Sequence, residues 1–354
     1  MIEYNCTKIY LCMEKKTTIY DLAKVMNISP SYISKALNDH PSVSAAMREK
    51  VKKIASELNY KHNTYAANLR KGISKTIGVI VPHINKSFFS DIIAGVEEVC
   101  FEHDYGLIIC QSQESFDKEC RAIDTLTKQN VDALIISVSA ETKSSEHLNK
   151  CINSMNTILI DRDLNDFDGY KIINDNEEIG YKATAYLLHQ GYKNIVYLGW
   201  ISGLTINEQR KRGFMKALAD HNLQGRYFDG IIERSHISDV VTQLLTSDNA
   251  PDAFFTFSDF QGLCILQVAN SLGINVPNQL GILGTGNDSL TEISKTTLSA
   301  IDQNSIEMGK CAANLYFNIV DQKQNGKILA TKQKIIPIKI VPRESTALKI
   351  TSII

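Results

Sequence analysis

Two short helical patterns, separated by a turn of three residues, constrain the fold of the first part of this chain. Apolar residues recur at helical spacing after Thr18, and the pattern stops at residues 27–29. Asp21 follows Thr18 by three residues, which is close to a capping box. Ser29 is a good N-cap for the second helix, and Pro30 fits its first position, where a missing N–H costs nothing. The pattern predicts a helix-turn-helix.

The second helix, residues 30–37, is predicted to have an apolar and a polar face. The residues expected to be buried are Ile33, Ala36 and Leu37. The polar face carries Ser31, Tyr32, Ser34, Lys35 and Asn38. A third helix, capped near Ser44, would bury Val51, Ile54, Ala55 and Leu58 and expose Arg48, Lys50, Lys52 and Lys53. A polar, lysine-bearing helix face directly after a tight turn suits insertion into the major groove of DNA.

The distribution of charge supports a nucleic-acid partner. Residues 1–75 hold 13 Lys and Arg against 6 Asp and Glu, a net charge of +7. The whole chain has a formal net charge of −1, which leaves −8 for residues 76–354. A basic head on an acidic body is the asymmetry that phosphate binding by counterion release requires.

Several motifs in this region match one family. They are IYDLAKVMNIS at residues 19–29, Ser34-Lys35-x-x-Asn38, Val43-Ser44, Arg48-Glu49-Lys50-Val51, Leu58-Asn59-Tyr60 and Asn63-x-x-Ala66-x-x-Leu69. With them, the chain resembles the LacI/GalR family of bacterial transcription regulators, and the resemblance extends to about residue 345. It implies a helix-turn-helix DNA-binding domain at residues 14–62, followed by a hinge helix and linker at residues 63–74 that orders only on DNA.

The resemblance also implies how DNA is bound. A homodimer would bind a double-stranded operator with an approximate inverted repeat. Leu69 of each copy would enter the minor groove at the centre, where an apolar wedge partly unstacks a base step and kinks the duplex. The positions that match the family's DNA contacts are Tyr20, Ser29, Pro30, Ser31, Tyr32, Ser34, Lys35, Asn38, Ser44, Tyr60, Asn63, Ala66, Leu69 and Arg70.

The chain departs from the family at positions that choose the operator. Pro30 and Ser31 occupy the two leading recognition positions, and neither is a strong reader of base edges. Tyr32 stands where the family usually has Thr, and His62 where it usually has Pro. Lys35 replaces the commoner Arg, which loses the bidentate contact with guanine. We therefore expect an operator unlike the best-known ones of the family.

After Gly72 the pattern changes to short apolar runs that alternate with helical ones. The expected strands are residues 76–82, 106–111, 132–138, 157–161, 194–198, 253–257, 280–284 and 334–341. The expected helices are residues 88–103, 117–129, 180–189, 207–221, 237–245, 261–272 and 305–322. After residues 299–301 the chain is expected to cross back to the first half. Such alternation predicts parallel sheets with helices on both faces.

This body looks like the periplasmic-binding-protein architecture, in which two lobes close around a ligand. The predicted fold is an all-α helix-turn-helix head with a hinge helix, joined to an α/β periplasmic-binding-protein-like body of two Rossmann-like lobes at residues 75–345. Residues 1–13 are expected to be a disordered tail or a gene-start artefact. The tail at residues 346–354 is too short for a heptad seam, so we expect a dimer and no larger assembly.

The effector site is expected between the lobes, because ligands of open α/β sheets bind at the carboxyl ends of strands. The resemblance assigns effector contacts to Phe88, Phe89, Asp161, Arg162, Arg210, Ser258, Asp259, Asn287 and Gln303. An aromatic ring, an arginine and carboxylate or carboxamide groups suit a sugar or sugar derivative. A purine-responsive, corepressed regulator is the alternative. Neither a metal nor a cofactor is expected.

Some of these roles stay open in the sequence. One of Phe88 and Phe89 should face the ligand and the other the core. Arg210 could instead form a structural ion pair, and the two aspartates could cap helices or pair with Arg162. Gly286 replaces an Asp that holds the ligand in many relatives, so either Asn287 or Asp288 takes that role, or the ligand differs chemically.

Other classes of protein are disfavoured. An enzyme would need a catalytic constellation, and the chain has no Gly-x-Ser-x-Gly, no His-Glu-x-x-His and only a lone Gly-x-Gly at residues 284–286. A transport receptor would need a signal peptide and no basic head, and an architectural DNA-bending protein would not need a large body. The eight cysteines are scattered without a Cys-x-x-Cys, as in a reduced, cytoplasmic protein. No membrane partner is expected, since no apolar run is long enough to span a bilayer.

Overall fold

The structure is a computed structural model, and it describes residues 17–60, 73–152, 155–324 and 332–347. The chain divides into two compact units, residues 1–73 and 74–354, which we call the head and the body. Four of the residues predicted to contact DNA, Asn63, Ala66, Leu69 and Arg70, lie outside the described residues, as does the extension at residues 1–13.

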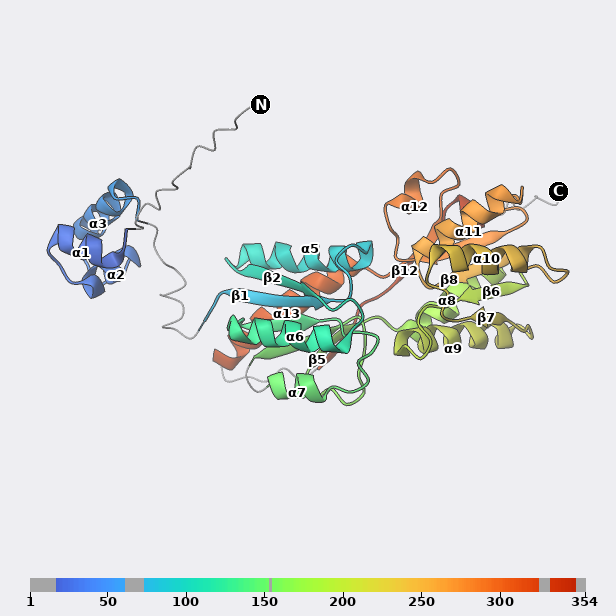
Figure 1. The fold of residues 1–354 in the computed structure, drawn as a ribbon, viewed down its shortest axis with the longest axis horizontal. Helices are drawn as coiled ribbons and strands as arrows, with labels where there is room; N and C mark the ends of the chain where they lie inside the picture. Colours follow the sequence, from blue (N-terminus) through green and yellow to red (C-terminus); the bar gives the residue numbers. More distant parts are fainter. Residues whose placement is uncertain (1–16, 61–72, 153–154, 325–331, 348–354) are drawn as a thin grey trace, which may run out of the picture. The chain divides into compact units, whose positions relative to one another are not determined.

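The head contains three helices, α1 (Ile19–Met26), α2 (Pro30–Leu37) and α3 (Ala45–Glu57) (Figure 1). The predicted caps are confirmed. Thr18 and Asp21 form a complete capping box at α1, and the side chains of Ser29 and Ser44 accept backbone N–H groups at the starts of α2 and α3. Asn27 adopts a left-handed conformation, with φ of 54°, which ends α1 and turns the chain into α2.

The three helices share one small core. It is formed by Leu22, Ala23, Ile33, Ala36, Val43, Val51 and Ala55, all of which are buried. The side chains on the opposite face of α2 are polar, as the sequence predicts. The core therefore fixes which face of α2 remains accessible to DNA.

The body has two lobes, each built on a six-stranded sheet. The strand order of the first lobe is β11-β5-β4-β3-β1-β2, and that of the second lobe is β12-β10-β9-β8-β6-β7. The first sheet contains β1 (Thr76–Val81), β2 (Gly106–Gln111), β3 (Ala133–Ile136), β4 (Asn156–Ile160), β5 (Tyr170–Ile173) and β11 (Gln333–Ile335). The second contains β6 (Ile195–Leu198), β7 (Arg226–Phe228), β8 (Ala253–Thr256), β9 (Gly281–Thr285), β10 (Ser299–Asp302) and β12 (Lys339–Val341).

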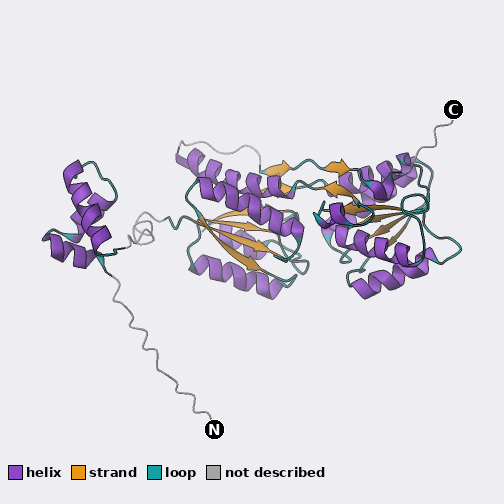
Figure 2. Ribbon diagram, turned by 90° about the horizontal axis from the view of Figure 1, so that it is seen from above, coloured by secondary structure: helices purple, strands orange, loops and turns teal. Residues whose placement is uncertain are grey.

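Helices cover both faces of each sheet, as Figure 2 shows from above. The first lobe has α5 (Ser87–Glu102), α6 (Phe116–Lys128), α7 (Glu146–Ile152) and α13 (Ser305–Gln324). The second has α8 (Asn176–His189), α9 (Thr205–Asp220), α10 (Arg234–Leu245), α11 (Asp259–Ser271), the short α12 (Leu290–Ile293) and a 3-10 turn at Glu344–Thr346. Every strand pair is parallel except β10 with β12, so the prediction of parallel α/β lobes is confirmed.

One predicted strand is wrong. Residues 334–341 were expected to form a single strand, but they form β11 in the first sheet and β12 in the second. Pro337 lies between the two and has no N–H to donate to a ladder, so it interrupts the pairing. The chain uses this interruption to pass from one lobe to the other. It also crosses between the lobes after β5 and after β10.

Glycines allow two pairs of helices to pack closely. A Cβ atom at Gly180 in α8 would lie 2.0 Å from the carbonyl oxygen of Arg210 in α9, and one at Gly213 would lie 2.0 Å from that of Glu177. The α5–α13 contact of the first lobe is built in the same way, at Gly95. The backbone of α9 at Arg210 therefore rests directly on α8.

The six cysteines among the described residues are free. Within the described ranges, no helix is both long and apolar enough to span a membrane, and no cluster of His, Cys, Asp or Glu is suited to hold a metal ion.

Candidate functional site

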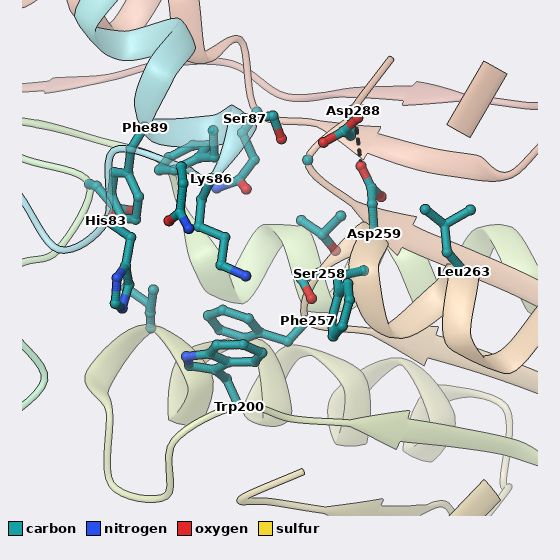
Figure 3. A pocket seen from close by; sticks show the side chains of 18 of the residues that line it. His83, Lys86, Ser87, Phe89, Trp200, Phe257, Ser258, Asp259, Leu263 and Asp288 are labelled. Carbon is teal, nitrogen blue, oxygen red and sulfur yellow. Dashed lines mark hydrogen bonds between the residues drawn. The ribbon is translucent and has the colours of Figure 1, made fainter. Parts of the chain in front are cut away.

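A cavity of about 290 Å³ lies between the lobes of the body (Figure 3). Its walls come from chain segments that follow parallel strands, as expected for an open α/β sheet. The first lobe contributes the segments after β1, β2 and β4, and the second lobe those after β6, β8, β9 and β10. Of the nine predicted effector contacts, eight line this cavity: Phe88, Phe89, Asp161, Arg162, Arg210, Ser258, Asp259 and Gln303. These residues are distant in sequence, and the fold brings them together.

Arg210 is the largest fully buried side chain of the body, with 2% of its surface exposed. Its Nε donates to Oδ1 of Asn176 at 2.9 Å, and its Nη1 donates to the carbonyl oxygen of Phe257 at 3.0 Å. Among the described residues, no hydrogen-bond partner meets Nη2. Burial lowers the pKa of Arg210, and the nearby Asp161 acts in the opposite direction. The guanidinium is thus fixed in position with one donor group left for a ligand.

Two aromatic side chains of the second lobe, Trp200 and Phe257, form a stack in the cavity wall. Their ring centroids are 5.8 Å apart and their planes differ by 15°. The guanidinium of Arg210 lies over the Phe257 ring, 4.4 Å from its centroid. Because the Phe257 ring is engaged by both neighbours, it supports the arginine, and Trp200 provides a broad apolar surface beside it (Figure 3).

In the first lobe, the arginine that lines the cavity is paired within its own wall. Nη1 and Nη2 of Arg162 donate to the two carboxylate oxygens of Glu114, and Nη1 also donates to the carbonyl oxygen of Val138. Asp161 accepts a hydrogen bond from the hydroxyl of Ser137 at 3.0 Å and lies 3.7 Å from Nε of Arg162. Burial raises the pKa of Asp161. Asp161 therefore lies beside Arg162, as one of the two expectations for this residue held, and it also lines the cavity.

The second lobe provides two aspartates, Asp259 and Asp288. Asp259 is 4% exposed, and its Oδ2 accepts the backbone N–H of Asp288 at 2.7 Å, whereas Oδ1 is buried without a partner among the described atoms. Asn287 does not line the cavity, because its amide is held by Arg343 and Asp302. Of the two candidates at this turn, Asp288 is the one that faces the cavity.

The turn that carries Asp288 requires a glycine. Gly286 has φ of +136°, a conformation that side chains disfavour, and a Cβ atom there would lie 3.0 Å from Oδ2 of Asp259. An aspartate at position 286 would therefore have a strained backbone, and its carboxylate would be repelled by that of Asp259. The carboxylates of this wall are supplied by Asp259 and Asp288 instead.

Burial raises the pKa of Asp259 to about 6. Between its ordinary value of 3.8 and about 6, the folded protein holds a proton that the unfolded chain releases. The stability from this proton is complete below the lower value and is lost as pH rises through about 6. The free energy of unfolding of Asp259→Asn, relative to the parent, should therefore rise by about 1 kcal/mol between pH ~5 and ~7.5.

Chemical denaturation at several pH values measures this difference. Asp248→Asn is the control, since Asp248 is exposed and does not line the cavity. A difference for Asp259→Asn that stays constant with pH would contradict the assignment of the proton to Asp259.

Phe88 and Phe89 both contribute to the lining, although the sequence suggested that they divide the roles. Phe89 is also part of the core of the first lobe, and the two rings meet edge to face with centroids 5.2 Å apart. Gln303 lies at the crossing between the lobes, where its Nε2 donates to Oδ1 of Asn174 at 3.1 Å. Ser258 is the N-cap of α11, and its side chain accepts the N–H of Gln261.

Several lining residues were missed by the sequence analysis. They are His83, Asn85, Lys86, Ser87, Glu114, Trp200, Ile206, Phe257, Phe260, Leu263, Thr285 and Leu290. Trp200 and Phe257 were within reach of the sequence, because each closely follows a buried strand at the edge where ligands bind. Trp200 is also the single tryptophan of the chain.

In the head, the predicted DNA-reading face of α2 is accessible. Ser31, Lys35 and Asn38 are exposed, while Pro30, Tyr32 and Ser34 are half-buried. Ser29, Ser44 and Tyr20 are also exposed, and Tyr60 packs against the core of the head. Asn38 ends α2, and its Nδ2 donates to the carbonyl oxygen of Ser34 at 2.7 Å.

Comparisons with known proteins agree with both units. Residues 18–63 match the model of the bacterial regulatory proteins of the lacI family, and residues 74–341 match that of periplasmic binding proteins and the sugar binding domain of the LacI family. The chain belongs to the LacI family. The LacI-family head and body thus account for nearly all described residues, and the protein is a DNA-binding regulator.

Three individual relatives cover between 78% and 94% of the chain at 21% to 28% identity. The HTH-type transcriptional repressor PurR of Vibrio campbellii is 28% identical over 328 residues, which are 91% of this chain and 97% of that protein. The lac repressor dimer bound to operator and the anti-inducer ONPF superimposes with a TM-score of 0.81 at 21% identity, covering 94% of this chain and all of that one. A LacI-type regulator from Alkaliphilus metalliredigens complexed with D-xylulofuranose superimposes with a TM-score of 0.67 at 21% identity. The match covers 78% of this chain and 100% of that one.

Proposed function

We propose that this LacI-family protein is a transcriptional repressor that binds an operator as a homodimer and responds to a carbohydrate effector held in the cavity between its lobes. The observation that carries the proposal is the cavity itself, which joins a buried arginine with a free donor to an aromatic wall and to carboxylates from both lobes. Its volume of about 290 Å³ is at the lower end for ligand sites and suits a small metabolite.

The chemistry of the walls favours a sugar or sugar derivative. A carbohydrate presents an apolar ring face and a rim of hydroxyl groups that donate and accept hydrogen bonds. The indole of Trp200 matches the ring face, Nη2 of Arg210 matches a hydroxyl oxygen, and Oδ1 of Asp259 matches a hydroxyl hydrogen. A complex of the Alkaliphilus relative contains D-xylulofuranose, which supports the same class of ligand.

A ligand in this position contacts both lobes and can therefore change how far they close. Closure would alter the two segments that leave the dimeric bodies toward the DNA, and with them the hinge helices that carry Leu69. Effector and operator must then affect each other's binding equally, and a coupling of ~1–3 kcal/mol would change operator affinity by about 5–150-fold. Both induction and corepression follow from this scheme, depending on which closure state the effector prefers.

Lys35 on α2 should contribute directly to operator binding. Its side chain is exposed on the polar face, so Lys35→Ala should leave the head folded. Loss of one charged contact to a base or phosphate should weaken operator binding by about tenfold, or ~1.4 kcal/mol. Fluorescence anisotropy with a selected operator measures this effect.

The matched control is Lys53→Ala, which removes another exposed lysine, from α3. Its effect should be no more than about twofold. Equal losses for the two variants would mean that α2 contributes only general charge to DNA binding and does not read the operator.

The effector class is tested by measuring operator affinity and the thermal unfolding of the full chain with monosaccharides, disaccharides, sugar acids and purines. A ligand that binds the folded state raises the unfolding midpoint by mass action. We expect a sugar or sugar derivative both to stabilise the body and to change operator affinity. A response to purines and to no carbohydrate would contradict the proposed class while leaving the cavity as the site.

A further inference from the structure

The wall formed by the segment between β1 and α5 contains backbone donors without an acceptor, and a cation without an acidic partner, among the described residues. It comprises Lys86, Ser87 and Phe88, all of which line the cavity. We call these three residues the α5 entry. Lys86 is the N-cap of α5, and its side chain makes no capping hydrogen bond.

The first N–H groups of α5 are available to a ligand. The N–H groups of Phe89 and Ser90 donate to the carbonyl oxygen of Lys86. Within the described part of the chain, those of Ser87 and Phe88 donate to no partner, as is usual for the start of a helix without a side-chain cap. Because α5 has 16 residues, its dipole adds a partial positive charge at this point.

The ammonium group of Lys86 is the second component of this wall. Its Nζ forms no ion pair with any described acidic residue, and it lies 5.2 Å from the centroid of the Phe260 ring in the opposite lobe. In Figure 3 the side chain points into the cavity toward Trp200 and Phe257, whereas Asp259 and Asp288 lie together on another side. Glu114, an acid of the first lobe that lines the same cavity, is already held by Arg162 and by the N–H of Ala140.

A buried and incompletely satisfied cation lies in the same cavity. Arg210 is 2% exposed, and its Nη2 has no hydrogen-bond partner among the described residues. Nη2 is not among the side-chain atoms that are buried without a partner, so it opens into the cavity that Arg210 lines, where a ligand group can accept from it. The α5 entry and Arg210 therefore offer positively charged donor groups to the cavity from both lobes.

We propose that the effector carries an oxyanion substituent, a phosphate or a carboxylate, and that this group binds at the α5 entry between the ammonium of Lys86 and the N–H groups of Ser87 and Phe88. This inference rests on the proposed function, since it specifies the class of carbohydrate. The hydroxyl groups of the same ligand would face Asp259 and Asp288. The two ends of the cavity thus select a ligand that is anionic at one end and rich in hydroxyl groups at the other.

The first test uses inorganic phosphate as the probe on the full chain. Thermal unfolding of the parent, Lys86→Met, Lys86→Arg and the control Lys193→Met is compared in phosphate and in chloride at equal ionic strength. Lys193 is exposed and lies away from the cavity, and phosphate bound by the head contributes equally to all four proteins. We expect phosphate to raise the unfolding midpoint of the parent, Lys86→Arg and Lys193→Met more than that of Lys86→Met. Equal midpoint changes in all four, including no change, would overturn the proposal.

The second test identifies the oxyanion with matched ligands, D-glucose, D-glucose 6-phosphate and D-gluconate, and D-ribose with D-ribose 5-phosphate. Binding is measured by calorimetry, and operator affinity by anisotropy. For the ligand that binds, Lys86→Met should reduce the affinity of the charged form by about tenfold and that of the neutral sugar by less than about twofold. A preference for the phosphate or for the gluconate assigns the substituent.

The two proposals fail in different ways. Neutral sugars that bind and change operator affinity, with charged forms no better and no effect of Lys86→Met, would refute the oxyanion site and leave the proposed function intact. A phosphate effect that depends on Lys86, with no carbohydrate of any charge changing operator affinity, would support the oxyanion site and refute the carbohydrate effector.

Discussion

Replacing Arg210 by alanine is expected to abolish the effector response. The guanidinium is buried, fixed by Asn176 and Phe257, and turns its remaining donor to the cavity. Loss of a charge-assisted hydrogen bond together with the supporting contacts should weaken effector binding by about 100-fold or more. Calorimetric titration of the effector measures the loss, and anisotropy measures the remaining change in operator affinity.

Operator affinity without effector should remain within about threefold of the parent, because the head is a separate compact unit. The matched control is Arg212→Ala in the same helix, where an exposed arginine pairs with Glu177 on the surface. It should leave the response unchanged. A full response in Arg210→Ala would exclude the arginine from the site, and an equal loss in both variants would indicate a general effect on α9.

Gly180→Ala should cause a large loss of stability of the body. The added Cβ would lie 2.0 Å from the carbonyl oxygen of Arg210, and backbone atoms on both sides leave no flexible group that could move away. The helices α8 and α9 would have to separate, at a cost of about 3 kcal/mol. The unfolding midpoint of the body should fall by about 5–10 °C. Differential scanning calorimetry measures this change.

Gly106→Ala is the control for this prediction. It adds the same methyl group at the start of β2, where no atom lies within 4 Å, and should change stability by less than about 0.5 kcal/mol. Because Gly180 contacts the backbone of Arg210, Gly180→Ala should also reduce effector affinity. A midpoint for Gly180→Ala equal to that of Gly106→Ala would show that the two helices pack less closely than described.

The sequence predicted best the elements that have clear boundaries. The second helix of the head has the predicted bounds, since Ser29 caps it, Pro30 begins it and the polar residues after Leu37 end it. The eight effector positions found in the cavity lie directly after parallel strands, or in the helices that come next along the chain. This is where ligands of open α/β sheets bind. The start of α8 at Asn176 was missed by four residues, because its N-cap Asp175 precedes the apolar pattern.

Elements that depend on tertiary context were not predictable in this way. The strands β5 and β7 have only four and three residues, too few for a periodic signal, and β7 lies at the edge of its sheet. Residues 334–341 are divided between two sheets because of where the two lobes lie. A local sequence pattern carries no information about that arrangement. The stack of Trp200, Phe257 and Arg210 joins three chain segments, so its geometry appears only in the folded body.

The central claim is that the cavity between the lobes and the DNA-binding head are coupled. The most direct test is the calorimetric affinity of the identified effector for the full chain, measured with and without saturating operator DNA, with Arg210→Ala as the reference for non-specific heat. Reciprocal linkage predicts that operator changes effector affinity by about 5–150-fold, and by the same factor that effector changes operator affinity. An effector affinity that is unchanged by saturating operator would contradict the account.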